Sequence, residues 1–192
     1  MSDIRVVVAE DEAIIRMDLV EVLREEGYDV VADTGRGDDA VALVMEHRPD
    51  LALLDVKMPG MTGIEAAREI TSSADTAVVM LTAFSQRELI HEASDAGAMA
   101  YLVKPYQRED LVPAVELAIA RRREAAALRS ELDAAEQRFE ERKTIDRAKG
   151  KLIDEHSLSE GDAFTFLQRS AMSSRRRMID VAHEVLAGDA TP

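Results

Sequence analysis

Short apolar runs alternate with longer helix-like stretches through the first 105 residues of the chain. The runs are rich in β-branched residues, which favours strands at residues 4–9, 29–34, 51–54, 77–81 and 100–103. Between them, the apolar spacing is typical of helices near residues 12–26, 38–47, 63–72 and 86–96. Strands that alternate with helices build βαβ units. The pattern therefore predicts the α/β class, as a doubly wound five-stranded parallel sheet covered on both faces.

A long helix is predicted to follow this α/β domain. It begins near Glu109, and residues 117–142 contain no glycine, no proline and mostly strong helix formers. Apolar side chains at alternating spacings of three and four residues form a short heptad seam: Ala125, Leu128, Leu132, Ala135 and Phe139. The seam suits a dimerising coiled coil and a connecting helix packed on its own chain equally well.

Three further apolar-periodic segments, residues 145–153, 163–172 and 178–186, predict a small three-helix bundle. Ser159 and Asp162 have the spacing of a capping pair at a helix N-terminus. Ser173 or Ser174 is predicted to cap the last helix in the same way. We expect three parts: an α/β domain over 1–120, a helical linker over 121–141 and a bundle over 142–188.

Composition narrows the class of protein. The 192 residues, 46% of them hydrophobic, are enough for two modest cores. The absence of cysteine excludes disulfides, thiolate metal sites and cysteine nucleophiles. The start of the chain is unlike a signal peptide, and no apolar stretch approaches the roughly 18 residues that a membrane helix needs. We therefore expect a soluble, cytoplasmic protein with no membrane partner.

Charge is distributed unevenly between the two halves. The net charge of the whole chain is −14, and residues 1–120 carry all of that excess, with 10 basic against 24 acidic residues. Residues 121–192 are balanced, and within 142–177 nine basic residues face five acidic ones. A polyanion such as a nucleic acid is therefore a plausible partner of the C-terminal part only.

Five polar residues follow or end predicted strands: Glu10, Asp11, Asp55, Thr82 and Lys104. Ligands of doubly wound sheets bind at the carboxyl ends of the strands, so these side chains are expected on one rim. Each alone has an ordinary explanation as a helix cap, a turn residue or a surface charge. Together they fit metal-assisted phosphoryl chemistry, and clustered carboxylates need a compensating cation. Because only oxygen ligands are present, Mg²⁺ is the expected ion.

These residues stand in motifs that resemble the receiver domain of bacterial response regulators, which has a flavodoxin-like fold. The matching stretches cover residues 9–12, 53–60, 81–83 and 101–105, together with Gly63. The resemblance extends over about residues 3–120 and implies that a sensor histidine kinase phosphorylates Asp55. It further implies magnesium ligation by Asp11, Asp55 and the Lys57 carbonyl. Glu10 replaces the usual aspartate, so it is expected to reach the metal through water.

The same resemblance implies roles for three more residues. Thr82 and Lys104 would hold the phosphoryl oxygens, and Tyr101 would be an aromatic switch that moves inward with Thr82. Lys104-Pro105 resembles the cis peptide of the family, which would aim the lysine. Phosphorylation would then shift the population between two packings of the surface around the fifth strand.

The C-terminal part offers a poor match to a DNA-binding helix-turn-helix, because it lacks predicted strands after the last helix and a glycine-containing tight turn. From about residue 132 it resembles the ANTAR domain, an RNA-binding module of antitermination regulators. The matching residues are Arg142, Ile145, the run 147–152, Leu158, Ser159, Ala163, Phe164, Leu167, Ala171, Met172, Val181 and Ala182. Ser157 stands where that family usually has glycine.

By this resemblance the chain would bind paired RNA hairpins of a nascent transcript and would not be an enzyme. The basic candidates for RNA contact are Arg147, Lys149, Lys151, Arg169, Arg175, Arg176 and Arg177. We expect Phe164 to be a core residue, and Ala148 and Gly150 to permit close approach of helices. A DNA-binding regulator and a receiver with a protein-binding tail remain the alternatives. Homodimerisation on phosphorylation and release of an intramolecular clamp are both open as routes of activation.

Overall fold

The computed structural model describes residues 4–83 and 87–192, and it contains the predicted five-stranded sheet. All pairings are parallel and the strand order is β2-β1-β3-β4-β5. The strands are β1 (Arg5–Ala9), β2 (Asp29–Thr34), β3 (Leu51–Asp55), β4 (Ala77–Thr82) and β5 (Ala100–Val103). The order reverses at β1 and β3, which places the expected ligand crevice at the carboxyl ends of these two strands.

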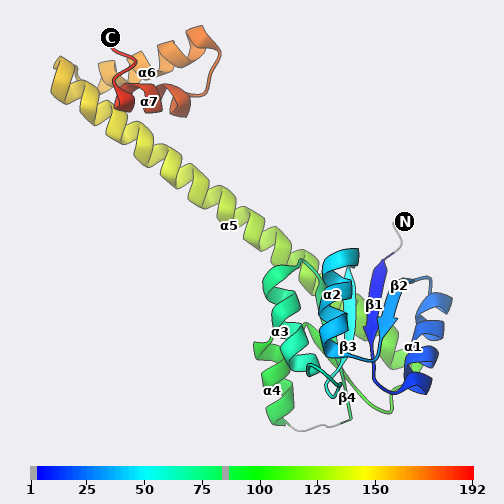
Figure 1. Cartoon of the computed structure of the whole chain (residues 1–192). Coiled ribbons are helices and arrows are strands. Elements are labelled where there is room, and N and C mark those ends of the chain that lie inside the picture. The colour runs from blue at the N-terminus through cyan, green and yellow to red at the C-terminus, as the bar shows by residue number, and fades with distance from the viewer. Residues whose placement is uncertain (1–3, 84–86) are drawn as a thin grey trace. The chain divides into compact units, whose positions relative to one another are not determined.

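Helices cover both faces of the sheet because successive strand residues point to opposite sides. Val6 and Val8 face a core formed with α1 (Ala13–Glu25) and the start of α5 (Arg108–His156), whereas Val7 faces the opposite core. That second core is closed by three helices, α2 (Gly37–His47), α3 (Gly63–Ser73) and α4 (Arg87–Asp95). Figure 1 shows the strands lying between α1 and the pair α2 and α3. The predicted α/β class is confirmed; residue 86, the predicted start of the fourth helix, lies outside the described residues.

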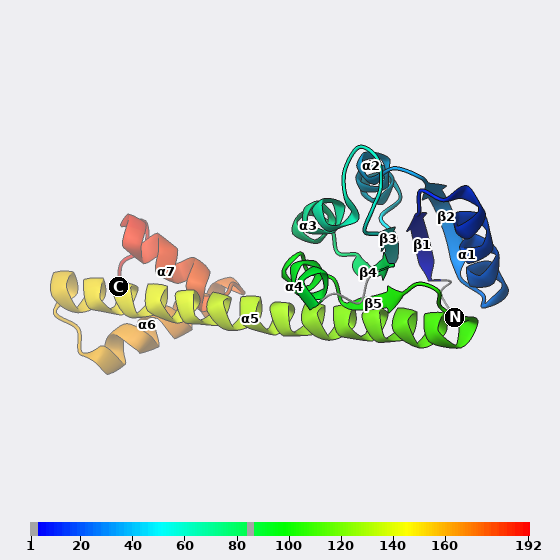
Figure 2. The same cartoon turned by 90° about the horizontal axis from the view of Figure 1, so that it is seen from below.

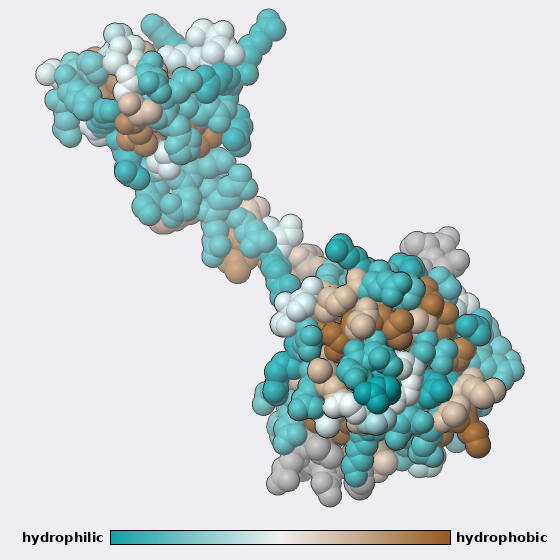
Figure 3. Space-filling model, viewed as in Figure 1, coloured by the Kyte–Doolittle hydropathy of each residue, from teal (hydrophilic) through white to brown (hydrophobic). Residues whose placement is uncertain are grey.

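Helix α5 (Arg108–His156) is longer than the sequence predicted and is continuous over 49 residues. The chain divides into two compact units within it, residues 1–126 and 127–192, called here the N-terminal and C-terminal units. Every side chain from 123 to 140 is exposed, including the seam residues Leu128, Leu132 and Phe139. Apolar patches accordingly interrupt the hydrophilic surface in the space-filling view (Figure 3).

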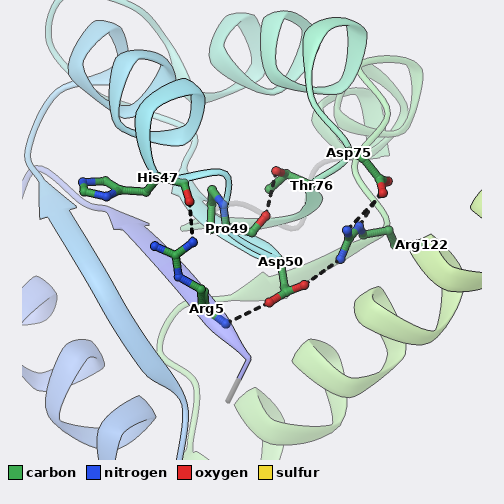
Figure 4. A network of polar contacts seen from close by, with 7 residues as sticks. All are labelled: Arg5, His47, Pro49, Asp50, Asp75, Thr76 and Arg122. Atoms are coloured by element: carbon green, nitrogen blue, oxygen red, sulfur yellow. Dashed lines mark hydrogen bonds and ion pairs between the residues drawn. The ribbon is translucent and has the colours of Figure 1, made fainter. Parts of the chain in front are cut away.

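A polar network at the amino-terminal ends of the strands attaches α5 to the sheet (Figure 4). The Arg122 guanidinium donates hydrogen bonds of 3.0–3.1 Å to the carboxylates of Asp50 and Asp75. Asp50 directly precedes β3 and also accepts a hydrogen bond from the backbone N–H of Arg5 at 3.0 Å. The buried Thr76 hydroxyl donates to the carbonyl of Pro49 at 2.9 Å. The loops before β3 and β4 are thereby connected to α5.

The C-terminal unit packs the end of α5 against α6 (Glu160–Ser174) and α7 (Met178–Ala187), as Figure 2 shows. The residues buried between these three helices are Ala148, Leu152, Ala163, Leu167, Ala171, Val181, Ala182 and Val185. The predicted segment 145–153 is thus the last part of α5 and not a separate helix. Among the described residues, no helix combines the length and apolar character needed to cross a membrane.

The helix boundaries in this unit confirm one predicted cap and correct another. The Ser159 hydroxyl accepts a hydrogen bond from the Asp162 backbone N–H at the start of α6, as expected. Ser173 and Ser174 do not cap α7, because both hydroxyls donate to the Ser170 carbonyl inside α6. Helix α7 begins at Met178, with Arg177 at its N-cap position.

Ser157 ends α5 in a left-handed backbone conformation, with φ of +54°. Its N–H donates to the Ile153 carbonyl at 3.0 Å, so it occupies the position after the helix where glycine is the usual residue. The serine therefore adopts the turn that a glycine would adopt more easily.

Candidate functional site

Three carboxylates meet where β1 and β3 end. One oxygen each from Glu10, Asp11 and Asp55 lies within 4.8 Å of the others. Glu10 and Asp55 are buried, whereas Asp11 is exposed and leaves the cluster open to solvent on one side. Like charges this close repel one another, and one lysine cannot balance three carboxylates. An all-oxygen donor set with one open side fits a hard divalent cation such as Mg²⁺.

Lys104, which follows β5, reaches across to this cluster. Its ammonium group pairs with Asp55 Oδ1 at 3.0 Å and with Glu10 Oε2. Burial raises the pKa of the Glu10 and Asp55 carboxyls, and the hydrogen bonds from Lys104 oppose this only in part. Burial acts to lower the pKa of Lys104, but its two carboxylate partners outweigh burial and leave that pKa raised. At neutral pH the lysine is a fixed positive charge against the oxygen of Asp55.

The backbone around Asp55 explains why glycine stands at position 63. A Cβ added to Gly63 would lie 1.9 Å from the Asp55 carbonyl oxygen, so no larger residue fits without moving the strand end. The Gly63 N–H also donates to the Val56 carbonyl at 3.0 Å, which closes the loop after β3. This contact fixes the orientation of the segment that carries Asp55.

Arg16 is a positioning residue that sequence reasoning missed. Its guanidinium donates to the Glu10 carbonyl at 2.6 Å and to the Asp33 carboxylate at 3.0 Å. It therefore holds the loop after β1 against the end of β2. Its position one turn into the first helix, directly after an acidic loop, could have indicated this role from the sequence.

The remaining predicted residues of this site lie on β4, on β5 and in the loop after β3. Thr82 is buried at the end of β4, and its carbonyl accepts a hydrogen bond from the Lys104 N–H at 2.7 Å. Lys57 is exposed in the loop after β3, and Tyr101 on β5 is 49% exposed. The Lys104-Pro105 peptide bond is cis, as the motif predicted. The structure thus brings Glu10, Asp11, Asp55 and Lys104 together, while the functional role of each stays a prediction.

The predicted RNA-contacting cations fall into two groups. Four of them have partners in their own unit: Lys149 with Asp146 and Glu160, Lys151 with the Leu186 carbonyl, Arg176 with Glu184, and Arg177 with Glu141 and Asp180. Within the described residues, Arg147, Arg169 and Arg175 are exposed and form no salt bridge. The second group is the more available to an external polyanion.

Two expectations about apolar packing in this unit were wrong. A Cβ added to Gly150 would meet nothing within 4 Å, so this glycine is not required for close approach of helices. Ala148, by contrast, is fully buried in the core, as expected. Phe164 is 42% exposed, because Ala163 and Leu167 fill the core from α6 and leave the aromatic ring outside it.

Family models match both units of the chain. The model of the response regulator receiver domain matches residues 6–116, and the ANTAR domain model matches residues 133–186. The chain therefore belongs to the response regulators and combines a receiver with an ANTAR domain. It is similar over nearly its whole length to the transcriptional regulatory protein PdtaR of Mycobacterium tuberculosis. The two are 54% identical over 188 residues, which cover 98% of this chain and 92% of that protein.

Two further comparisons match a smaller share of the chain. The chemotaxis protein CheY of Bacillus subtilis is 36% identical over 112 residues, covering 58% of this chain and 93% of that protein. Among solved structures, the response regulator domain of Thermotoga maritima CheB superposes with a TM-score of 0.58 at 28% identity. That match covers 62% of this chain and 97% of the CheB domain. The flavodoxin-like receiver fold is thereby confirmed.

Proposed function

We propose that this chain is a phosphorylation-controlled antiterminator, in which phosphorylation of Asp55 by a sensor histidine kinase controls binding of RNA hairpins by the C-terminal unit. The observation that carries the proposal is the joining, by one helix, of an acidic cluster with its lysine to an ANTAR domain. The relative with 54% identity is named as a transcriptional regulator, which supports an output in transcription.

The chemistry follows from the cluster. An Asp55 oxygen attacks the phosphorus of a phosphohistidine, an O–P bond forms, the N–P bond breaks, and the imidazole leaves. Asp11, Asp55 and the Lys57 carbonyl would hold Mg²⁺, with Glu10 acting through water, and the ion would supply positive charge against the phosphoryl oxygens. Lys104 already contacts Asp55 at 3.0 Å and would hold one phosphoryl oxygen, with Thr82 holding another.

The output rests on the local excess of cations within residues 142–177, where nine basic residues face five acidic ones. RNA phosphates bind such cations with strong salt dependence, because each contact releases counterions. Arg147, Arg169 and Arg175 are exposed and form no salt bridge in the described part of the unit, so binding phosphate there breaks no existing pair.

Gel-shift assays on the full chain test this function. Protein treated with Mg²⁺ and a small acyl phosphate is expected to retard a two-hairpin leader RNA, and the affinity should fall steeply with added salt. An Asp55→Asn variant should show the affinity of untreated protein under both conditions. Retardation of duplex DNA alone, or of neither nucleic acid, would contradict the proposal and favour a DNA-binding or a protein-binding output.

A further inference from the structure

A groove lies inside the C-terminal unit, between α5 and the N-terminal halves of α6 and α7. Its volume is about 370 Å³, which is within the size range of small-ligand sites. Apolar side chains from all three helices contribute to its lining: Ile145, Phe164 and Met178. Charged side chains of α5 complete the lining: Arg138, Glu141, Arg142, Asp146 and Lys149. The groove therefore combines an aromatic wall with a charged edge.

The charges of this groove are not balanced. Glu141 is paired with Arg177 at 3.4 Å, and Asp146 is paired with Lys149 at 2.9 Å. Arg138 and Arg142 are exposed and form no salt bridge among residues 4–83 and 87–192. Lys149 also pairs with Glu160, and Arg177 also pairs with Asp180. Among the residues that line the groove, three cations face two carboxylates, and the guanidinium groups of Arg138 and Arg142 are available to an anion without breaking a salt bridge.

Phe164 contributes an exposed aromatic ring to the groove. Its ring is 42% exposed although the core of the unit is already filled by other residues of α6. A single exposed apolar side chain is ordinary on a protein surface. This one lines the same groove as Arg142, so an aromatic face and an exposed guanidinium group lie together. Proteins that recognise unpaired RNA use this combination, stacking a base on the ring and binding the adjacent phosphate.

We propose that this groove takes one unpaired base of the hairpin RNA, with the base stacked on Phe164 and its phosphate bound by Arg142. The proposal rests on the RNA-binding function proposed above and specifies how that surface separates a loop from a duplex. A paired base is held within the helical stack and cannot enter the groove, so duplex RNA would bind only through its phosphates.

The test uses the full chain, treated with acyl phosphate and Mg²⁺, and two-hairpin RNAs that carry 2-aminopurine at one loop position at a time. Stacking on an aromatic ring quenches 2-aminopurine fluorescence, so one loop position should be quenched by the wild-type protein. Phe164→Leu should abolish that quenching and weaken RNA binding on the order of tenfold. Phe164→Tyr should retain both properties, which separates stacking from a folding defect.

Met172→Leu is the matched control, because Met172 is 73% exposed on the same helix and does not line the groove. It should leave quenching and affinity unchanged. If the wild-type protein binds the RNA but no loop position is quenched, or if Phe164→Leu binds and quenches as the wild type does, the groove proposal is overturned and the RNA-binding function stands. If the wild-type protein binds no RNA, both proposals fail.

Discussion

Lys104 forms ion pairs with two carboxylates, and these pairs determine where the acidic cluster would bind a metal ion. The lysine neutralises part of the charge on Glu10 and Asp55, while exposed Asp11 forms no salt bridge in the part of the chain that the structure describes. A divalent cation would therefore gain most at the side where Asp11 lies. Glu10 is one methylene longer than aspartate, which allows it to contact Lys104 from the end of β1.

Magnesium is accordingly expected to stabilise the N-terminal unit. At a Mg²⁺ concentration ten times its dissociation constant, the free energy of unfolding should rise by about 1.4 kcal/mol. Asp11→Asn should remove most of this gain with little effect on metal-free stability, because the side chain is exposed. Thermal unfolding with and without Mg²⁺ measures both effects. An equal gain in the Asp11→Asn protein would place the ion elsewhere.

Ser157 offers a second prediction for a single residue. Its φ of +54° lies in the left-handed region, which disfavours every residue with a Cβ. Ser157→Gly should therefore stabilise the C-terminal unit by about 0.5–1 kcal/mol, after the greater entropy of glycine in the unfolded chain is subtracted. Ser157→Ala should give no such gain. Denaturant unfolding compares the three proteins, and a destabilised glycine variant would contradict the assigned turn.

Helix α5 is the element that both units share, and its attachment to the sheet depends on Arg122. The guanidinium is 19% exposed and binds two carboxylates, so it is better placed than an ordinary surface ion pair. Burial acts to raise the pKa of Asp50, but hydrogen bonds from the Arg5 N–H and from Arg122 outweigh burial and leave that pKa lowered.

The lowered pKa of Asp50 gives a pH-dependent prediction. A carboxyl with a depressed folded-state pKa contributes stability above its unfolded value, near 3.9, and loses it as the pH falls through the folded value. Arg122→Gln should therefore cost about 1–2 kcal/mol at pH 7 and progressively less below about pH 4. Chemical denaturation across this range measures the difference. Arg129→Gln, on the exposed part of α5, is the control and should cost little at any pH.

The elements were largely predictable because apolar periodicity follows burial. The predicted boundaries of all five strands lie within one residue of the observed ones, because glycine, proline or charged residues flank the apolar runs. The cap at Ser159 was predicted from its spacing to Asp162 and is confirmed. The predicted segment 178–186 likewise matches α7, but its predicted cap at Ser173 or Ser174 was wrong, because backbone hydrogen bonds end α6 just after these residues. Arg175 takes a left-handed conformation, and the Arg176 N–H bonds the Ala171 carbonyl, a turn that a run of arginines does not signal.

The candidate site was predictable for a different reason. Topology brings strand ends together, so Glu10, Asp11, Asp55 and Lys104 could be placed on one rim from the strand assignments alone. The exposure of Phe164 could not be predicted from the sequence, because its spacing on α6 matches that of the core residues. Only the packing of Ala163 and Leu167 decides that the ring lies outside.

For the whole molecule, the exposed seam on α5 is the feature that bears on assembly. Leu128, Leu132 and Phe139 are each at least 58% exposed, which is costly for apolar side chains unless a partner covers them. We expect the phosphorylated chain to dimerise along residues 125–139. Light scattering should show a doubling of mass on treatment with acyl phosphate and Mg²⁺, and Leu128→Lys with Leu132→Lys should prevent it.

The control for this experiment adds the same charge away from the seam. Ala127→Lys with Ser130→Lys places two lysines on the outer positions of the same heptads and should leave the dimer intact. A monomer in both states of the wild-type protein would instead favour activation by release of a clamp within one chain.

Strand β3 offers a way to detect whether a change at one rim of the sheet reaches the other rim. It is buried along its entire length, with Asp50 directly before it and Asp55, the proposed phosphorylation site, at its end, so the five residue steps of the packed strand separate the two rims of the sheet. At about 3.3 Å per residue this is a span of about 17 Å in an interior that resists compression. The NMR chemical shift of the Asp50 amide would therefore report whether phosphorylation of Asp55 changes the structure at the opposite end of the strand. If the chemical shift of this amide changes on phosphorylation, a structural change at Asp55 is transmitted through the strand to the opposite rim. If the chemical shift is unchanged, the change stays local to the rim that carries Asp55.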